Sequence, residues 1–172
     1  MSLNIKDIRA AFIDLNEQLA KMKQIGEIGL CGGAVMCLVF QAREATKDID
    51  AIFEPTAAIR KAAELVAKKR GLPKDWLNDA AKGYFLSEPP KISVMELSHL
   101  RIWAPSAEYM LAMKAISARF DTHDRDDVIF LIEHLKLKKV AEVLAVIGQY
   151  CPREKIPAKT QFLIEELLQT SV

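Results

Sequence analysis

Two aspartates separated by one residue, and a glycine pair upstream of them, are the residues of this chain best suited to chemistry. Asp48 and Asp50 flank Ile49 in the segment DIDAIFE, whose apolar residues alternate with acidic or small ones. In a strand, side chains at i and i+2 lie on one face, so both carboxylates can offer oxygen atoms to a cation such as Mg²⁺. Gly32-Gly33 follows a short apolar run, and a glycine turn there lets the backbone approach a phosphate closely. This combination is typical of a site for a metal ion and a phosphorylated ligand.

The periodicity of the apolar residues predicts the elements that would position these groups. Strands are predicted over Glu27–Cys31 and over residues 48–54, with a helix over residues 34–42 between them. Ahead of the first strand, apolar residues at helical spacing run over residues 8–19, and we expect that helix to end at Gly26. The pattern is strand, glycine turn, helix and strand.

The middle of the chain predicts a third helix and further strands. Thr56 is expected to cap a helix that ends at Gly71. Residues 76–90, which contain Gly83 and Pro89-Pro90, predict an irregular connection with a short strand. Lys91–Leu97 and Leu100–Trp103 are β-prone and are expected at the edge of the same sheet.

From Pro105 onward, apolar stripes at helical spacing predict a helical C-terminal third. We therefore expect the α/β (α+β) class, with a mixed sheet flanked by helices. Residues 1–104 are expected to form the α/β core. Residues 105–172 are expected to form a helical region that packs on this core in the same compact unit.

Composition restricts the classes of partner. The chain of 172 residues is 51% apolar and 27% charged, with a formal net charge of only +1, so it gives no support for strong non-specific binding to nucleic acid or to an anionic membrane. Its three cysteines have no metal-knuckle spacing, and no apolar run is long enough to span a bilayer. We expect a cytoplasmic protein with no membrane partner.

Two segments resemble one known superfamily. Gly32-Gly33, fourteen intervening residues and Asp48-Ile49-Asp50 match the hG[GS]…Dh[DE]h pattern of the nucleotidyltransferase superfamily that includes DNA polymerase β. The run GGAVMCLVFQAREATKDIDAIFEP resembles the GG-helix-R-x-x-T-x-DID pattern of small bacterial nucleotidyltransferase-like proteins, including antitoxin-like ones. PSAEYMLAMKAISARFDTHDRDDVIFL is similar to their downstream helices, in which a lysine precedes an alanine-arginine pair and an acidic stretch. The matches span about half of the chain.

The resemblance implies a nucleotidyltransferase fold with Mg²⁺ or Mn²⁺ as cofactor. By that resemblance Asp48 and Asp50 would ligate the metal. By the same resemblance Gly32 and Gly33 would hold the triphosphate, and Lys114 and Arg119 would approach the nucleotide. Asp127 is also carried over, as a residue that would orient Arg119 or Arg125 near the cleft. Lys114 has a physical reason to be there, because an ammonium offsets charge on leaving pyrophosphate, but an exposed helical lysine is the alternative interpretation.

Active members of this superfamily place a third carboxylate on a later strand, where it completes the metal site and helps to deprotonate the attacking hydroxyl. Glu96, in SVMEL, is the candidate by strand position, and a solvent-facing role is the alternative. His123 with the acidic residues around it could suggest another metal cluster; these residues are Asp121, Asp124, Asp126 and Asp127. They surround a predicted helix start, however, where acidic side chains interact favourably with the helix dipole.

The sequence supports two functional hypotheses. The first is a Mg²⁺-dependent enzyme that moves a nucleoside monophosphate from a nucleoside triphosphate to an unknown hydroxyl of a protein, an RNA or a small molecule. The second is an antitoxin-like or nucleotide-binding regulatory module with little or no transferase activity, whose partner could be a toxin-like protein. No P-loop or dinucleotide-binding glycine motif is present to suggest another phosphate chemistry.

Overall fold

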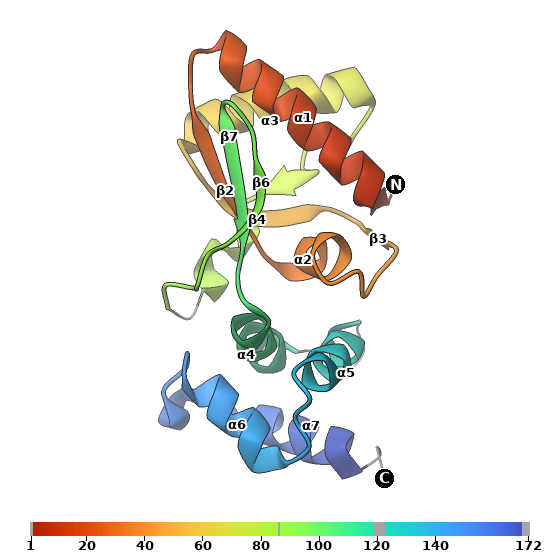
Figure 1. Cartoon of the computed structure of the whole chain (residues 1–172), viewed down its shortest axis with the longest axis vertical. Helices are drawn as coiled ribbons and strands as arrows, with labels where there is room; N and C mark the ends of the chain where they lie inside the picture. The colour runs from red at the N-terminus through yellow and green to blue at the C-terminus, as the bar shows by residue number, and fades with distance from the viewer. Residues whose placement is uncertain (1, 86, 119–122, 170–172) are drawn as a thin grey trace. The chain divides into compact units, whose positions relative to one another are not determined.

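The computed structural model describes residues 2–85, 87–118 and 123–169 (Figure 1). Its described residues form seven α-helices, a five-stranded mixed sheet and a two-stranded sheet, which confirms the predicted mixed α/β class. Contacts divide the chain into two compact units. The sheet unit comprises Met1–Gly83 with Lys91–Pro105, and the helical unit comprises Tyr84–Pro90 with Ser106–Val172.

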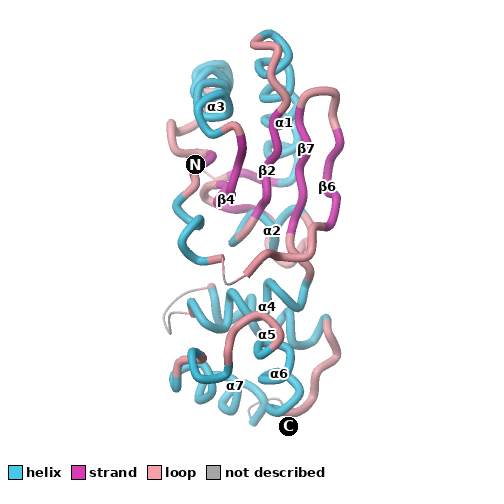
Figure 2. The backbone as a smooth tube through the Cα atoms, turned by 90° about the vertical axis from the view of Figure 1, so that its left-hand side faces the viewer, coloured by secondary structure: helices cyan, strands magenta, loops and turns pink. Residues whose placement is uncertain are grey.

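Five strands in the order β5-β4-β2-β7-β6 form the main sheet. Figure 2 shows β4, β2, β7 and β6 side by side. Strand β2 is antiparallel to β4 and parallel to β7, while β6 and β7 form an antiparallel hairpin. The strands are β2 (Gly26–Leu30), β4 (Ile49–Glu54), β5 (Leu77–Asn78), β6 (Ile92–Glu96) and β7 (Leu100–Ala104). The expectation that both hairpin strands lie at the edge was wrong for β7, because its pairing with β2 leaves only β6 at that edge.

Helices α1 (Ile5–Lys21) and α3 (Thr56–Arg70) pack on each other and on the sheet (Figure 1). Strand β4 shows how the sequence separates the two faces. Ile49 and Phe53 are buried, whereas Asp50 is half-buried and Glu54 is exposed. Because side chains alternate across a strand, the apolar set lies on the helix-covered face and the acidic set on the opposite face.

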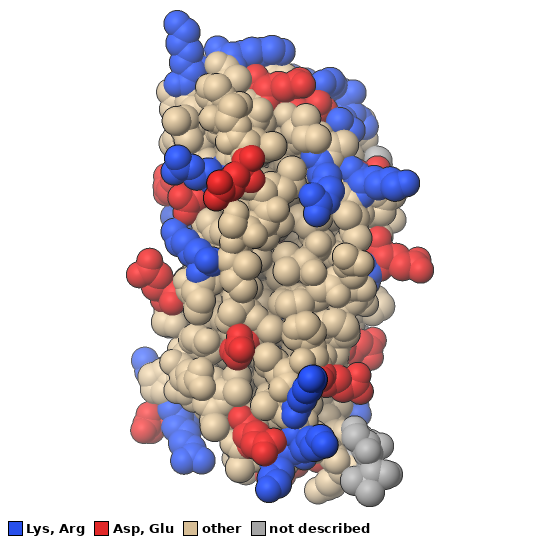
Figure 3. Space-filling view, in the orientation of Figure 1, with Lys and Arg blue, Asp and Glu red and all other residues tan. Residues whose placement is uncertain are grey.

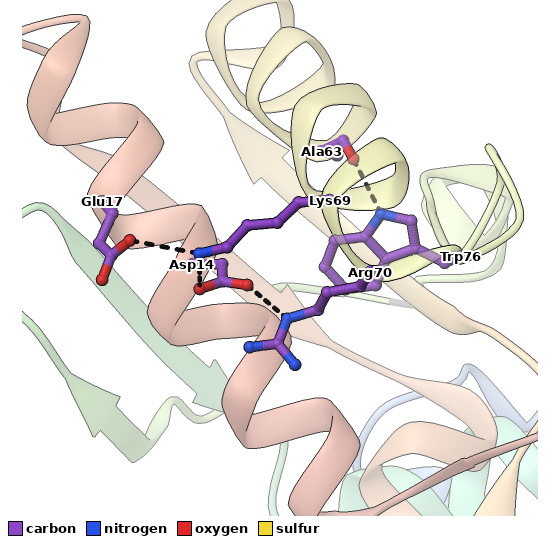
Figure 4. A network of polar contacts seen from close by, with 6 residues as sticks. All are labelled: Asp14, Glu17, Ala63, Lys69, Arg70 and Trp76. Carbon is purple, nitrogen blue, oxygen red and sulfur yellow. Dashed lines mark hydrogen bonds and ion pairs between the residues drawn. The ribbon is translucent and has the colours of Figure 1, made fainter.

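A buried carboxylate links the two helices (Figure 4). Asp14 of α1 is 4% exposed. It accepts a hydrogen bond from Lys69 Nζ at 2.8 Å and another from Arg70 Nε, both at the C-terminal end of α3. Trp76, which is fully buried, donates from Nε1 to the carbonyl of Ala63 at 3.0 Å. The Asp14 contacts hold α3 against α1, and the Trp76 hydrogen bond attaches the segment before β5 to α3.

The first helix begins as its sequence requires but ends earlier than expected. Asn4 caps α1 by accepting hydrogen bonds from the backbone of Lys6 and Asp7. The helix ends at Lys21, and Gly26 is the first residue of β2 instead of the helix terminator. A Cβ on Gly26 would lie 2.9 Å from Leu19, so the glycine serves the packing of helix against sheet.

Two further helix boundaries differ from the prediction. Pro55, not Thr56, is the N-cap of α3, because the Thr56 hydroxyl donates to the carbonyl of Phe53 instead of accepting from the helix. Gly71 ends α3 as predicted, in the left-handed conformation with φ of 65°. Helix α2 (Gly32–Leu38) starts at the glycine pair itself and is shorter than the predicted segment.

A small second sheet connects the N-terminus to the segment that precedes Asp48. Its strands are β1 (Leu3–Asn4) and β3 (Ala45–Thr46), with Leu3 paired to Thr46. Leu3 is 1% exposed. The burial of Leu3 therefore helps to fix the chain just before the aspartate pair.

The helical unit confirms the predicted helical C-terminal third. The helices are α4 (Ala107–Ser117), α5 (Asp124–His134), α6 (Val140–Gly148) and α7 (Ala158–Gln169). The buried Tyr109 hydroxyl donates to the carbonyl of Ser87 at 2.6 Å, which attaches the 84–90 segment to α4. None of the helices that the structure describes is long and apolar enough to cross a membrane.

Candidate functional site

The glycine turn after β2 lies directly against the carboxylate of Asp50. Gly32 has φ of +60°, a conformation that side chains disfavour, and a Cβ there would lie 3.0 Å from Asp50 Oδ2. A backbone hydrogen bond also joins the end of β2 to β4, because Cys31 N donates to the carbonyl of Asp50 at 3.0 Å. The turn and the aspartate strand therefore meet as the sequence predicted.

Gly33 lies against the loop that carries Asp48. A Cβ on Gly33 would lie 2.8 Å from Thr46 Oγ1 and 3.4 Å from Arg43 Nη1. Thr46 Oγ1 donates to the carbonyl of Asp48 at 3.0 Å. The arginine and threonine of the R-x-x-T-x-DID run thus lie against the glycine turn, and the threonine holds the backbone of the first aspartate. The spacing of Arg43 and Thr46 before the aspartate pair is the sequence signal that could have identified these two residues.

The donor set at this place suits a small hard cation. Asp50 lies in β4, Asp48 precedes the strand directly, and both are half-buried. Mg²⁺ is commonly held by one or two carboxylates together with phosphate oxygens and water, so two aspartates fit such an ion. Among the residues that the structure describes, no group of three or more His, Cys, Asp or Glu side chains is placed to hold a metal ion.

Glu96, the expected third carboxylate, lies at another place in the sheet. The registers align Glu96 with Arg101, Arg101 with Glu27, and Glu27 with Glu54. Asp50 is four residues from Glu54 along β4, and β2 and β7 separate β4 from β6. Strand rise and spacing then give about 13 Å along the strands and about 14 Å across them, or roughly 20 Å in all. The structure does not bring Glu96 together with Asp48 and Asp50, because the antiparallel hairpin carries it to the opposite end of the sheet.

Lys114, the lysine that the resemblance implies for phosphate binding, lies in the helical unit and forms ion pairs there. Lys114 is 8% exposed, and its Nζ lies 2.9 Å from Asp124 Oδ1 and 2.8 Å from Asp127 Oδ2. Asp127 is 2% exposed. Both aspartates lie in the first turn of α5. The lysine thus joins α4 to α5 through a buried ion pair with Asp127 and a partly exposed one with Asp124, so it is not the exposed helical lysine considered from the sequence.

The remaining candidate residues lie between α4 and α5 or at the start of α5. Arg119 and Asp121 lie outside the described residues. His123 precedes α5, and its exposed ring is 3.9 Å from Asp126. The acidic residues in the first turn of α5 agree with the helix-start interpretation of this stretch.

Asn78 is a residue beside the aspartates that sequence reasoning did not select. Strand β5 is parallel to β4, with Asn78 paired to Asp50 and Leu77 paired to Ile49. Trp76 and Leu77 are buried, and this short apolar pair before Asn78 is the only sequence signal of the strand.

A separate hollow lies at the other end of the sheet. It is an open cavity of about 360 Å³, lined by Ile25, Gly26, Glu27, Glu54, Pro55 and Arg101. Glu27 accepts hydrogen bonds of 2.8 Å from Lys91 Nζ and from Trp103 Nε1. The hydrogen bond from Lys91 lowers the pKa of Glu27 against the opposing effect of burial. The cavity lies at the end of the sheet where Glu54, Glu27 and Arg101 are paired, away from the glycine turn.

The exposed charges are mixed in sign. Figure 3 shows Lys and Arg interspersed with Asp and Glu over the visible face, without a large continuous patch of either sign. This agrees with the formal net charge of +1. On this face, therefore, nothing resembles the basic stripe that non-specific nucleic-acid binding requires.

Comparison of the chain with protein-family models, with curated proteins and with solved structures gave no match in any of the three. Membership of the nucleotidyltransferase superfamily remains an expectation from the two motif segments. The chemistry of the site rests on the contacts among Gly32, Gly33, Thr46, Asp48 and Asp50.

Proposed function

We propose that this chain binds a nucleoside triphosphate together with Mg²⁺ or Mn²⁺ at the glycine turn and the aspartate pair, as a regulatory module with little transferase activity. The observation that carries the proposal is the contact between Gly32 and the carboxylate of Asp50. It puts a backbone suited to phosphate within reach of a carboxylate suited to a cation. A metal–triphosphate complex needs both at one place.

Each residue has a distinct part in this proposal. Gly32 and Gly33 leave room for the Asp50 carboxylate and the Thr46 hydroxyl to lie against the turn, at places where a Cβ would come within 3.0 Å and 2.8 Å of them. The backbone of the turn would bind phosphate oxygens. Asp48 and Asp50 hold the cation, and Thr46 keeps the Asp48 segment in place through its hydrogen bond to the backbone carbonyl. The bound metal would supply positive charge to offset that of the phosphates.

The location of Glu96 supports the regulatory form of the proposal over efficient transfer. In transfer, an acceptor oxygen forms a bond to the α-phosphorus while the bond to the pyrophosphate oxygen breaks. The acceptor proton must pass to a base. Glu96 would lie roughly 20 Å from the aspartates by strand spacing, too far to serve as that base.

The second candidate is a nucleotidyltransferase with a hydroxyl acceptor on a protein, an RNA or a small molecule. The observation that favours it is that Asp50 lies beside the glycine turn and that Asp48 precedes its strand directly. These two aspartates are the pair that the resemblance implies for metal ligation. A toxin-like protein partner is compatible with either candidate. We place both in the cytoplasm.

The decisive experiment measures binding and transfer on the same variants. Fluorescent ATP and GTP analogues are titrated into wild type with Mg²⁺ and with chelator, and incorporation from α-labelled triphosphates into protein and RNA is followed. We expect Mg²⁺-dependent binding that the Asp48→Asn/Asp50→Asn double variant loses. Glu96→Gln is the matched control and should bind like wild type.

Either part of this expectation can fail. Equal binding by wild type and the double variant would overturn the site. Loss of binding in Glu96→Gln to the same extent would contradict the sheet geometry. Incorporation that depends on Asp48 and Asp50 would instead establish the second candidate and identify its acceptor class.

A further inference from the structure

Asn78 shares the polar face of the sheet with Asp50. The two residues are direct neighbours in the parallel pairing of β5 with β4. Paired residues point to the same face, and adjacent strands lie about 4.8 Å apart. The flanking pair differs in burial, because Leu77 and Ile49 are 6% and 0% exposed whereas Asn78 and Asp50 are both half-buried. The side chain of Asn78 therefore emerges beside the carboxylate of Asp50.

A local hydrogen bond sets the direction of the Asn78 amide. Its Oδ1 accepts from the backbone N–H of Ala80 at 3.0 Å. With the oxygen held toward its own chain, Nδ2 carries the two protons that the side chain can offer elsewhere. Within the part of the chain that the structure describes, no group accepts a hydrogen bond from Nδ2. The site thus presents two carboxylates and one neutral donor.

We propose that Asn78 positions the nucleotide, with Nδ2 donating a hydrogen bond to a phosphate oxygen of the triphosphate held at Asp48 and Asp50. This inference rests on the proposed function and adds a residue to the same site. A neutral donor suits a phosphate, because a third carboxylate there would repel the phosphate oxygens. That same carboxylate would strengthen the hold on a bare cation by adding a negatively charged ligand.

The variant Asn78→Asp separates these effects. Its carboxylate keeps the shape of the side chain and still accepts from Ala80, so the turn after β5 is preserved. It loses both donor protons and adds a negative charge beside Asp50. We expect affinity for a fluorescent ATP analogue with Mg²⁺ to fall about tenfold, the loss of one hydrogen bond to a charged group. We expect affinity for Mn²⁺ alone to rise, by about tenfold.

The test titrates both probes into the full chain, with Mn²⁺ followed by electron paramagnetic resonance of the free ion. Gln24→Glu is the matched control: it adds the same charge at an exposed position before β2, near the opposite end of the sheet. It should leave both affinities unchanged. Asn78→Ala should weaken nucleotide binding and leave Mn²⁺ binding unchanged. Opposite changes for the two probes in Asn78→Asp alone support the inference, since a merely structural role would weaken both.

The possible failures can be told apart. If Asp48→Asn/Asp50→Asn abolishes nucleotide binding while both Asn78 variants bind like wild type, the role of Asn78 is overturned and the proposed function stands. If Gln24→Glu shifts both probes as Asn78→Asp does, the effect is one of net charge and the inference also falls. If wild type binds no nucleotide, the proposed function falls and this role falls with it.

Discussion

Replacing Asp14 by asparagine tests how the sheet unit is held together behind the candidate site. The carboxylate is 4% exposed and receives hydrogen bonds from Lys69 and Arg70. Asparagine keeps the volume but removes the charge, and it replaces one of the two oxygens, each of which accepts one donor, by an NH2 group that cannot accept. One hydrogen bond and both charge interactions are then lost.

The expected cost follows from the exposure of the partners. Breaking a fully buried ion pair costs about 3–5 kcal/mol, because the remaining charge is left without water. Here the Lys69 and Arg70 side chains are 52% and 32% exposed, so water can solvate both after the change. We therefore expect a smaller loss, about 2 kcal/mol in the free energy of unfolding, close to the value of a hydrogen bond to a charged group. For a unit of this size, that corresponds to a fall in Tm of roughly 10 °C.

The same variant has a defined pH dependence. Burial raises the pKa of Asp14, but the hydrogen bonds from Lys69 and Arg70 and their charges outweigh it, so the pKa lies below the ordinary value of 3.8. A carboxylate with a lowered pKa contributes stability above its unfolded pKa and loses it as pH falls through the folded one. The difference between wild type and Asp14→Asn should thus be complete at pH 7 and shrink below about pH 4.

Urea denaturation followed by circular dichroism at pH 7, 5 and 3 measures this difference. Glu17→Gln is the control, because Glu17 lies 3.7 Å from Lys69 but is 52% exposed, and it should change stability by less than about 0.5 kcal/mol. The reasoning is refuted if Asp14→Asn matches wild type at pH 7. It is also refuted if the difference stays constant down to pH 3.

Three further changes test packing and burial. Gly29→Ala should lower the free energy of unfolding by about 1–3 kcal/mol and alter tryptophan fluorescence, because the new Cβ would lie 2.2 Å from the Trp103 ring; unchanged urea melting would contradict this. Lys114→Met should cost about 3 kcal/mol in chemical denaturation, because it removes the Lys114 ammonium from the buried carboxylate of Asp127. A second change of Asp127 to Leu should restore more than half of this loss. Burial raises the pKa of the Cys37 thiol, so this residue should resist iodoacetamide at pH 8 in the folded protein and react after denaturation, as peptide mass mapping would show.

The pairing of the glycine turn with the aspartate strand could be predicted from the sequence because it depends on neighbours along the chain. Only the rest of the short helix α2, a loop and the two-residue strand β3 separate Gly33 from Asp48. The alternation in DIDAIFE indicates a strand with an acidic face. Strand β4 then folds back beside β2, so that Asp50 meets Gly32. Local periodicity also sufficed for the long helices, whose apolar stripes face their cores.

By itself, then, the sequence determined the mixed α/β class, the long helices and the candidate turn with its two aspartates. The tertiary structure decided which residues from distant parts of the sequence lie beside the two aspartates and which do not. It placed Glu96 at the far end of the sheet, Lys114 in buried ion pairs and Asn78 beside Asp50. The physical reason is that strand order and register are set by contacts between segments far apart in the chain. The composition of the sequence and the spacing of its residues do not specify these contacts, because the same alternation of apolar and polar residues lets a strand pair with several different neighbours in a sheet.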